Sequence, residues 1–566
     1  MPVILGIHDS AFDSGATIIK DDDIIASLHE ERLCRIKHSG AFPFLSIKEV
    51  LKISNIDPSE IEKVAIGFEN PNAALQFFQY YFNSSSKLNP LKSKWDYVKL
   101  TTFEKYEEQL KNNTIKKLNK SVSNLIQNHL LRKLGINSQI IRIDHHLCHA
   151  ASAYFSSGYN KCLVITADAR GDGISTSINI ANNGLIERIA SSDEKTSMGH
   201  FYGGVTEILG FGYADGEGKT EALAAFGKQS NAYDKLKSYA RVEKLLLKGN
   251  INTKKRLLSI YYSNLLYGYQ REDIAYAAQK ILEEIFVNLI QNAIDETGIS
   301  DIALAGGIFL NVKLNKKIME IPDLKDVFIH PAAGDSGIST GAAFILYSEL
   351  YGLKSNRWKH VYLGNSSSDE EIKKSLKKTD LKYEYIDNIS EYVGEQILPK
   401  DKLIGWFQDR MEYGPRALGC RSVLIDPRNP KSPSMVNTKF KHRPAFQPYC
   451  PSILREEESH YINNPKKIDA SFMIMAFNTK PDMIKEAPAV VFTDHTSRIQ
   501  VVDKKYNKKF YDLLEYFYKE TKVPILLNTS FNRAGEPIVC KPEEAINDFI
   551  ITNLDYLVMG NYLITK

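Results

Sequence analysis

The chain repeats one pattern of three strands and two turns, and this repeat constrains its fold more than any other feature. The first copy has apolar runs at residues 3–7, 15–19 and 24–28. The second copy has apolar runs at residues 162–166, 174–178 and 185–189. Short apolar runs bounded by glycine, aspartate and asparagine turns are typical of strands that pair as hairpins. The repeat therefore predicts two antiparallel meanders, each followed by helical segments.

These two meanders resemble the fold shared by actin, the large heat-shock chaperones and the sugar kinases. In that fold, two similar halves bind a nucleotide between them on paired glycine turns. The resemblance implies an α/β N-terminal domain of duplicated structure. The alternative is coincidence, because any two hairpins look alike and these two share few residues.

Length and composition predict more than one domain. The chain has 566 residues, of which 43% are hydrophobic, and this exceeds what one core usually serves. Glycine, asparagine and serine interrupt the pattern after residue 351. Such a stretch is typical of a linker, so we place a boundary near Leu363, between units at 1–363 and 364–566.

Two helical regions are expected outside the meanders. Apolar residues recur at helical spacing from 272 to 298, which predicts a long amphipathic helix packed on the second half. Residues 70–135 are rich in lysine, asparagine, phenylalanine and tyrosine, and indicate a helical insertion with a solvated charged face. Neither region has a motif for chemistry.

The charge balance gives no sign of a polyanionic partner. Lys+Arg number 72 and Asp+Glu number 68, a net charge of +4, so we expect neither a nucleic-acid nor a membrane surface. No apolar run approaches the roughly 20 residues that span a bilayer. The six cysteines are scattered without CxxC spacing, and the first residues lack a signal-peptide pattern. We expect a cytoplasmic protein with reduced thiols.

A pair of histidines suggests a metal site. His145 and His149 are four residues apart in a run that is predicted to be helical, so both rings point from one face. Asp168 and Asp335 are each expected where a strand gives way to a glycine-rich turn. Two imidazoles and two carboxylates can hold a metal and leave an open position. The alternative is an ordinary helix whose histidines only pack or bond to carbonyls.

Glycine turns beside strands and helix starts predict a nucleotide site in the first unit. Backbone amides at such turns approach phosphate oxygens without interference from a Cβ. The candidate residues are Gly203, Gly204, Glu217, Lys219, Gly306, Gly307 and Asn311. Glycine turns more often serve only to reverse the chain, which is the alternative for each of them.

The second unit has arginines spaced around glycine and proline. Rigidly held guanidinium groups grip phosphate or carboxylate through two hydrogen bonds. The pattern predicts a site for a small anionic substrate, made by Arg416, Arg421, Lys441, Arg443, Asn528 and Ser530. The last two are expected to follow a strand at 524–527. Salt bridges to Glu412, Asp426 or Glu536 are the alternative for the cations.

In the order of these motifs, the chain resembles the O-carbamoyltransferases of the NodU/CmcH class nearly end to end. The resemblance rests on strings at residues 8–10, 30–32, 37–38, 144–150, 217–219, 305–307, 331–335, 414–422, 528–532 and 535–537. The chain departs from the usual strings at Cys420, at 219–223 and at 447–449. These departures bear on the acceptor and on local packing more than on the reaction.

The resemblance implies a two-step reaction. The C-terminal unit, similar to threonylcarbamoyl-AMP synthases, would form carbamoyl-adenylate from carbamoyl phosphate and ATP with Mg²⁺, with Arg416 and Lys441 as catalytic residues. The N-terminal unit, similar to the tRNA threonylcarbamoyladenosine transferase, would move the carbamoyl group to a hydroxyl of a small-molecule natural product. There, His8 and Lys37 would be catalytic, and the two histidines and two aspartates would bind a divalent metal, with Fe²⁺ expected. The class is also compatible with a homodimer.

Three other functions fit parts of the sequence. A tRNA threonylcarbamoyl transferase shares the N-terminal site but lacks a fused unit with the string at 414–416. A metallopeptidase would need the glutamate of a His-Glu-x-x-His motif, which the pair at His145 and His149 lacks. A non-catalytic nucleotide-binding protein of the actin class would bind ATP without consuming carbamoyl phosphate. The carbamoyltransferase ranks first among these readings.

Overall fold

The computed structural model describes residues 2–10, 12–69, 113–249 and 255–566. The insertion predicted at 70–135 lies largely outside these residues, and the structure describes only its last helix, α5 (Asn113–Lys133). Within the described ranges, no helix is both long and apolar enough to cross a bilayer.

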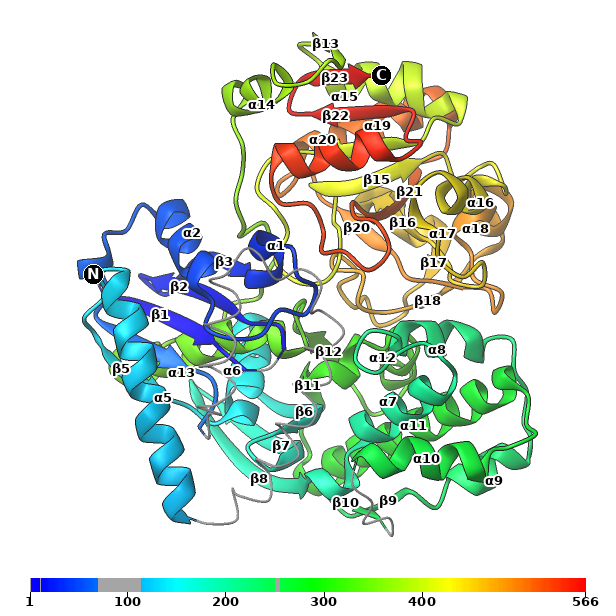
Figure 1. The fold of residues 1–566 in the computed structure, drawn as a ribbon. Coiled ribbons are helices and arrows are strands. Elements are labelled where there is room, and N and C mark those ends of the chain that lie inside the picture. The colour runs from blue at the N-terminus through cyan, green and yellow to red at the C-terminus, as the bar shows by residue number, and fades with distance from the viewer. Residues whose placement is uncertain (1, 11, 70–112, 250–254) are drawn as a thin grey trace.

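The first meander belongs to a five-stranded sheet with the order β3-β2-β1-β4-β5 (Figure 1). Its strands are β1 Val3–His8, β2 Gly15–Lys20, β3 Asp23–His29, β4 Lys63–Ile66 and β5 Gln139–Arg142. The first three are antiparallel, whereas β4 and β5 run parallel to β1. Two helices follow β3 and cover this sheet, α1 Glu30–Cys34 and α2 Phe44–Ser54.

The second meander builds a sheet with the same plan, in the order β8-β7-β6-β11-β12. Its strands are β6 Lys161–Gly171, β7 Ile174–Asn182, β8 Leu185–Asp193, β11 Asp301–Ala305 and β12 Asp326–Ile329. Again three strands are antiparallel, and the last two run parallel to the first of them. The predicted α/β domain with an actin-like duplication is therefore confirmed.

Two helices lie between the sheets and pack on each other, α6 His145–Ser157 and α13 Ile338–Tyr351. Small residues let them approach closely. A Cβ added to Gly341 would lie 1.8 Å from the Cys148 carbonyl oxygen. Because α6 also packs on β6 and β11, its first turn is fixed at the ends of the strands of the second sheet.

Most of a helical layer is inserted between β8 and β11 (Figure 1, green). Its elements are α7 Met198–Ile208, α8 Glu217–Ala224, α9 Asn231–Leu236, β9 Ala240–Glu243, β10 Leu246–Gly249, α10 Lys255–Leu265 and α11 Arg271–Thr297, with α12 Val312–Met319 joining it after β11. The long helix predicted from 272 to 298 is α11, and its apolar positions are buried as expected.

The prediction of a glycine turn at Gly203 and Gly204 is wrong, because both residues lie inside α7. A Cβ on Gly203 would lie 2.5 Å from the ring of Tyr213, and one on Gly204 would lie 3.2 Å from the ring of Tyr262. The missing side chains therefore make room for aromatic rings that pack on the helix. Buried amides in the middle of a helix bond to its own carbonyls and do not bind phosphate.

The C-terminal part forms an eight-stranded mixed sheet with the order β13-β23-β22-β14-β15-β21-β16-β20. Its strands are β13 Lys382–Tyr385, β14 Ile404–Phe407, β15 Arg421–Ile425, β16 Cys450–Leu454, β20 Gln500–Val502, β21 Ile525–Ser530, β22 Tyr556–Met559 and β23 Tyr562–Thr565. A small second sheet contains β17 Ile462–Asn463, β18 Phe477–Thr479 and β19 Thr496–Ser497. The helices are α14 Asp369–Leu376, α15 Ile389–Tyr392, α16 Ser432–Val436, α17 Glu458–Tyr461, α18 Pro481–Glu486, α19 Lys508–Thr521 and α20 Pro542–Ile551.

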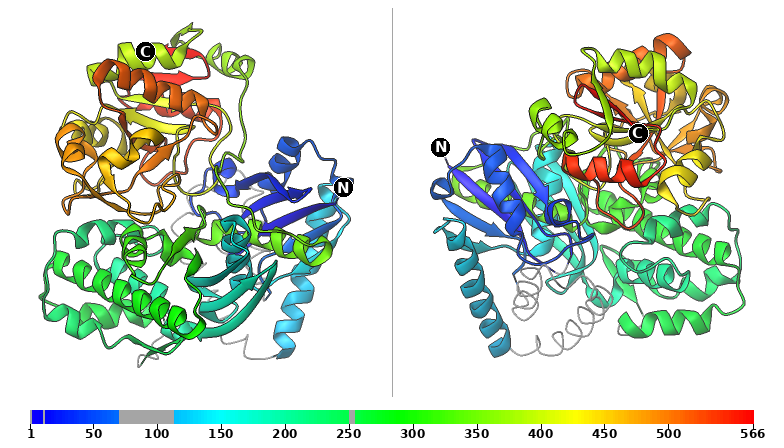
Figure 2. Two further views of the ribbon diagram at one scale, coloured as in Figure 1. Left: turned by 180° about the vertical axis from the view of Figure 1, so that it is seen from behind. Right: turned by 45° about the horizontal axis from the view of Figure 1, so that its top comes forward.

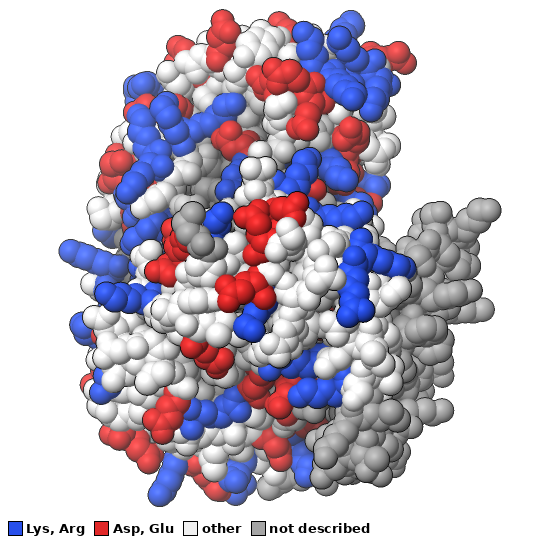
Figure 3. All heavy atoms as spheres, turned by 90° about the vertical axis from the view of Figure 1, so that its left-hand side faces the viewer, with Lys and Arg blue, Asp and Glu red and all other residues white. Residues whose placement is uncertain are grey.

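The C-terminal part lies across the N-terminal part, as Figures 1 and 2 show from three directions. Asn315 on α12 donates a 2.6 Å hydrogen bond to the carbonyl of Ile474, and Arg410 donates to the carbonyls of Leu363 and Ile25. The boundary predicted near Leu363 falls in an irregular segment and stays a prediction. Basic and acidic side chains are interspersed on the face seen in Figure 3, in keeping with the small net charge.

Candidate metal and anion sites

Three elements bring the predicted metal ligands together. His145 and His149 lie one turn apart at the start of α6, where the Asp144 side chain caps the helix by accepting from the backbone N–H of Leu147. Asp335 begins a 3₁₀ turn before α13. Asp168 lies within β6, at an irregularity in its pairing with β7, and not after the strand as predicted. The donor atoms of the two histidines and two aspartates all lie within 4.8 Å of one another.

We call these four side chains, His145, His149, Asp168 and Asp335, the metal group. Their charges interact strongly. His149 Nε2 lies 3.1 Å from Asp168 Oδ2 and 3.6 Å from Asp335 Oδ1. Burial favours the neutral ring, yet these two carboxylates raise the pKa of His149 to about 9. Burial also opposes ionisation of Asp168, but the neighbouring rings of His145 and His149 hold the pKa of its carboxyl well below its usual range. Two carboxylates facing two buried rings are a place where a cation is favoured.

The residues present fit a divalent metal ion. Neither ring nitrogen of His145 has a hydrogen-bond partner among the described residues, although the ring is fully buried. A Cβ on Gly171 would lie 2.0 Å from that ring, so glycine is required there to seat it. Two imidazoles with two carboxylates suit several ions, among them Fe²⁺, Mn²⁺ and Zn²⁺.

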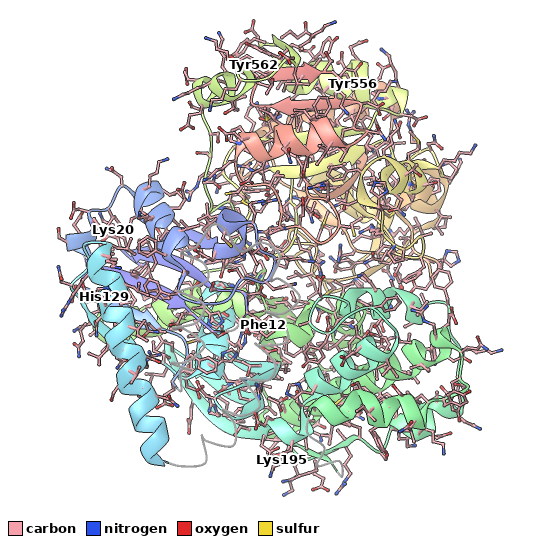
Figure 4. The ribbon with its side chains drawn as sticks, in the orientation of Figure 1. Phe12, Lys20, His129, Lys195, Tyr556 and Tyr562 are labelled. Carbon is pink, nitrogen blue, oxygen red and sulfur yellow. The ribbon has the colours of Figure 1, made fainter. Side chains whose placement is uncertain are left out.

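His8, predicted to be catalytic, lies beside the metal group at the end of β1. Its Nε2 is 3.7 Å from Asp335 Oδ2 and 2.9 Å from Ser10 Oγ. The ring is fully buried. Figure 4 shows Phe12, in the turn after β1, near the middle of the view, and this residue is 39% exposed. The metal group and His8 therefore lie close to a turn that solvent reaches.

Lys37 lies in a group of charged side chains that the sequence did not reveal. Its ammonium group contacts Asp215, which also lies 3.4 Å from His38 Nε2. His38 Nδ1 is 2.8 Å from Asp13 Oδ1. Burial alone would lower the pKa of His38, but the carboxylates of Asp13 and Asp215 raise it to about 10. Lys37, the predicted catalytic residue, is thus held in place by a carboxylate from the turn before α8.

The predicted glycine turn at Gly306 and Gly307 is confirmed, and it lies against the metal group. It follows β11, and Gly306 has φ +108°. A Cβ on Gly306 would lie 2.1 Å from the Ala167 carbonyl oxygen, and one on Gly307 would lie 3.1 Å from Asp168 Oδ1. Only glycine allows this close approach of the turn to β6.

The other predicted nucleotide-binding residues lie at the starts of two helices, α8 and α12. Asn311 caps α12 by accepting from the N–H of Leu314, and it also donates to Gln279. Glu217 begins α8 and accepts from the N–H of Ala214. Lys219 is half-buried in the first turn of α8, which begins three residues earlier than the helix expected from Thr220. Asn311 therefore has a structural role whether or not it binds a ligand.

Four cations gather in the C-terminal part and form what we call the cationic cluster, Arg416, Lys441, Arg443 and Arg498. None of them forms an ion pair with a carboxylate in the described ranges. Burial and the charge of Arg498 lower the pKa of Arg416 to about 9. Burial and the charge of Arg443 hold the pKa of Lys441 well below its usual range. Cations that lower one another's pKa favour an anionic ligand.

Neighbouring groups hold the cluster in place. Lys441 donates to Ser530 Oγ at 3.0 Å and to the carbonyl of Asn532 at 2.8 Å. The guanidinium of Arg443 stacks on Tyr449, 3.7 Å from the ring centroid. Ser530, a predicted ligand, lies within β21 and not after the strand. These contacts leave the Nε atoms of Arg416 and Arg443 without a partner in the described part of the chain.

The structure does not bring Arg421 to the cationic cluster. Its fully buried guanidinium donates to the carbonyls of Gln408, Asp409, Cys420 and Asn365 and lies 3.8 Å from the Phe407 ring centroid. The prediction that Arg421 grips phosphate is therefore corrected, because carbonyls from separate segments already bind both of its terminal nitrogens.

Asn528 also differs from its prediction. It lies within β21 and is buried there, and it donates to Ser452 Oγ at 2.9 Å and to the Ala417 carbonyl at 3.3 Å. It therefore supports the segment beside Arg416. The cluster member missed by sequence reasoning is Arg498, which lies between β19 and β20 in a string without glycine or proline.

Two contacts link the segments that carry the two sites. Arg416 donates a 3.3 Å hydrogen bond to the carbonyl of Leu310, in the turn that starts at Gly307. Lys441 lies close enough to Lys37 for their charges to interact. A ligand at the cationic cluster is therefore next to the elements that carry the metal group.

Comparisons with known proteins agree over both parts. The family termed Carbamoyltransferase N-terminus matches residues 3–344, and the family termed Carbamoyltransferase C-terminus matches residues 395–566. An uncharacterized protein of Methanocaldococcus jannaschii is 33% identical over the whole of both chains. Nodulation protein NolNO of Sinorhizobium fredii is 30% identical over 98% of this chain and 79% of its own length.

Two further proteins are similar over part of the chain. Nodulation protein NolO of Bradyrhizobium diazoefficiens is 32% identical over 75% of this chain and 79% of its own. The crystal structure of full-length HypF in its phosphate- and nucleotide-bound form covers 63% of this chain and 47% of its own, at 16% identity and a TM-score of 0.38. The latter similarity is too low to carry an argument. With two family matches that span both parts, the chain belongs to the carbamoyltransferase family.

Proposed function

We propose that the chain is an ATP-dependent O-carbamoyltransferase that works in two steps at its two sites. Carbamoyl-adenylate forms at the cationic cluster from carbamoyl phosphate and ATP, in a unit at 364–566. The carbamoyl group then moves to a hydroxyl of a small-molecule natural product beside the metal group, in a unit at 1–363. Both substrates of the first step are anions, and four cations without carboxylate partners in the described ranges support their binding.

The first step needs one water molecule for its atoms to balance. Water cleaves carbamoyl phosphate into carbamate and phosphate, and a carbamate oxygen then attacks the α-phosphorus of ATP and expels pyrophosphate. Negative charge grows on the leaving phosphate and pyrophosphate oxygens. We assign its stabilisation to Arg416 and Lys441, with Arg443 and Ser530 around them and Mg²⁺ on the nucleotide.

In the second step the acceptor hydroxyl attacks the carbamoyl carbon, its proton leaves, and AMP departs with the electron pair of the broken bond. His8 is the proposed base, because its buried ring lies beside the metal group and near an exposed turn. We assign to Lys37 the role of neutralising the negative charge of the adenylate phosphate. The amides at Gly306 and Gly307, aided by Glu217, Lys219 and Asn311, are proposed to hold AMP.

A divalent ion, for which we propose Fe²⁺, would be held by His145, His149, Asp168 and Asp335. When bound, it would supply a Lewis acid for the adenylate phosphate. The burial of both rings and the close contact of Gly171 with His145 fix where these donors lie.

The contact of Arg416 with Leu310 is the observation that carries the proposal. One residue belongs to the cationic cluster and also bonds to the turn beside Asp168. A product formed at the cluster would therefore arise beside the turn that contacts Asp168, and this supports a reaction in two successive steps.

The test is to incubate the full chain with ATP, carbamoyl phosphate and Mg²⁺, without an acceptor. Pyrophosphate release and carbamoyl-adenylate are followed by mass spectrometry. We expect both products from the wild type and from the control Arg455→Ala, whose arginine pairs with Asp503 on the surface, and neither from Arg416→Ala. Absence of adenylate from the wild type under every metal condition would overturn the proposal and favour a nucleotide-binding protein without this activity.

A further inference from the structure

The loop that carries Arg416 also touches the loop that carries the metal ligand Asp335. Tyr413 lies between the two units, and only 2% of its surface is exposed although its side chain carries a hydroxyl. Its hydroxyl donates a 2.7 Å hydrogen bond to the carbonyl of Ser336, the residue after Asp335. The same hydroxyl lies 2.9 Å from Thr340 Oγ1, in the first turn of α13. The Tyr413 hydroxyl thus contacts two points of the segment that follows Asp335.

The Asp335 loop needs such a support. It has Gly334 and Gly337 on its two sides, and glycine leaves the backbone more conformations than any other residue. A Cβ on Gly414, the neighbour of Tyr413, would lie 3.1 Å from the Pro331 carbonyl oxygen, so the two loops are in backbone contact. Packing and one strong hydrogen bond from outside the loop therefore restrict where the carboxylate can point.

Further residues of the N-terminal unit also contact the Tyr413 loop. Arg32, which is buried, donates a 3.0 Å hydrogen bond to the carbonyl of Gly414. The ring of His29 lies 5.0 Å from the ring of Tyr413. With Arg416 bonded to Leu310, the loop is held at three places on the N-terminal unit. Tyr413 is therefore a fixed point and not a mobile side chain.

We propose that Tyr413 is a positioning residue for the metal ligand Asp335, acting through the carbonyl of Ser336. This inference rests on the metal site of the proposed function. The C-terminal unit thereby completes the geometry of a site whose ligands all lie in the N-terminal unit. Groups that orient a metal ligand from behind typically change metal affinity about 10- to 100-fold when removed.

The experiment compares Tyr413→Phe with Tyr362→Phe in the full chain. Tyr362 is a matched control, since its hydroxyl donates a 3.0 Å hydrogen bond to a carbonyl of the same loop, Leu418, but does not touch the Asp335 loop. Each protein is titrated with Co²⁺ alone by calorimetry, and the visible d–d spectrum is recorded. We expect Tyr413→Phe to weaken Co²⁺ binding about tenfold and to alter the spectrum, with the control within about twofold of the wild type.

Three results would overturn the inference. Tyr413→Phe could bind Co²⁺ as the wild type does, with the same spectrum, in which case only the positioning role fails. Both variants could weaken binding equally, which would show a general loss of stability. Finally, the wild type could show no Co²⁺ binding that depends on His149, so that His149→Ala changes nothing. In that case the proposed metal site itself fails, and the inference with it.

Discussion

Lys37 and Asp215 form an ion pair that joins the two halves of the N-terminal domain. Asp215 also contacts His38, so one carboxylate orients two neighbouring cations. We predict that Asp215→Asn lowers the rate of carbamoyl transfer about tenfold, because a catalytic group that is no longer fixed loses much of its effect. Adenylate formation should be unchanged, and Asp215→Glu should restore part of the transfer rate.

The measurement is AMP release from carbamoyl-adenylate, with water or a test alcohol as the acceptor. Pyrophosphate release is recorded in parallel as the internal control. Equal loss of both activities in Asp215→Asn would contradict the assigned role, since it would indicate general damage to the fold.

A second prediction concerns pH and His38. Its pKa in the folded chain is about 10, above the ordinary value of about 6.5 that applies when the chain unfolds. The protonated ring therefore adds stability that is fully present below about pH 6.5 and is lost as the pH rises through 10. Asp13→Asn, which removes one partner, should lower the melting temperature most at pH 6 and hardly at all at pH 10.5. A difference from the wild type that does not change over this range would refute this account.

A third prediction tests the cation that sequence reasoning missed. Arg498→Ala should raise the KM for carbamoyl phosphate about tenfold or more, because a hydrogen bond from a charged group contributes about 1.5–3 kcal/mol. The assay is pyrophosphate release at varied carbamoyl phosphate, with Arg455→Ala as the surface control. An unchanged KM would remove Arg498 from the cluster's function and leave its position as a structural feature.

A fourth prediction follows from Gly171. Its added Cβ would collide with the ring of His145, and forcing extra atoms into a packed site typically costs about 1–3 kcal/mol. Gly171→Ala should therefore weaken Co²⁺ binding at least about fivefold. Gly218→Ala is the matched control, because a Cβ there meets nothing within 4 Å. Similar Co²⁺ affinities in the two variants would show that the ring of His145 moves without loss.

The fold was largely readable from local patterns. The six meander strands and the helix α11 follow from strand and helix periodicity, and the structure forms them as expected. The metal group was also readable, because two histidines one helical turn apart must share a face. Asp168 and Asp335 could be added because each lies beside a glycine-rich turn that follows an apolar run, although Asp168 proves to lie within β6.

Other features depend on contacts between distant segments, which no local pattern encodes. Arg421 stands in a string typical of anion binding, yet it is satisfied by carbonyls such as that of Asn365, far away in sequence. Arg498 has no motif and reaches the cluster only through the β19–β20 turn. Gly203 and Gly204 looked like a turn, but aromatic packing explains them better.

The two-site reaction is the central claim, and one comparison tests it most directly. Wild type, Arg416→Ala and His149→Ala are each given ATP, ¹⁴C-labelled carbamoyl phosphate, Mg²⁺, Fe²⁺ and a test alcohol as the acceptor, and labelled carbamoyl-adenylate and released AMP are quantified over time. We predict that Arg416→Ala forms no adenylate, whereas His149→Ala forms adenylate that accumulates above the wild-type level because it is not consumed. Loss of adenylate in both variants, or normal turnover in His149→Ala, would contradict a division of the reaction between the cationic cluster and the metal group.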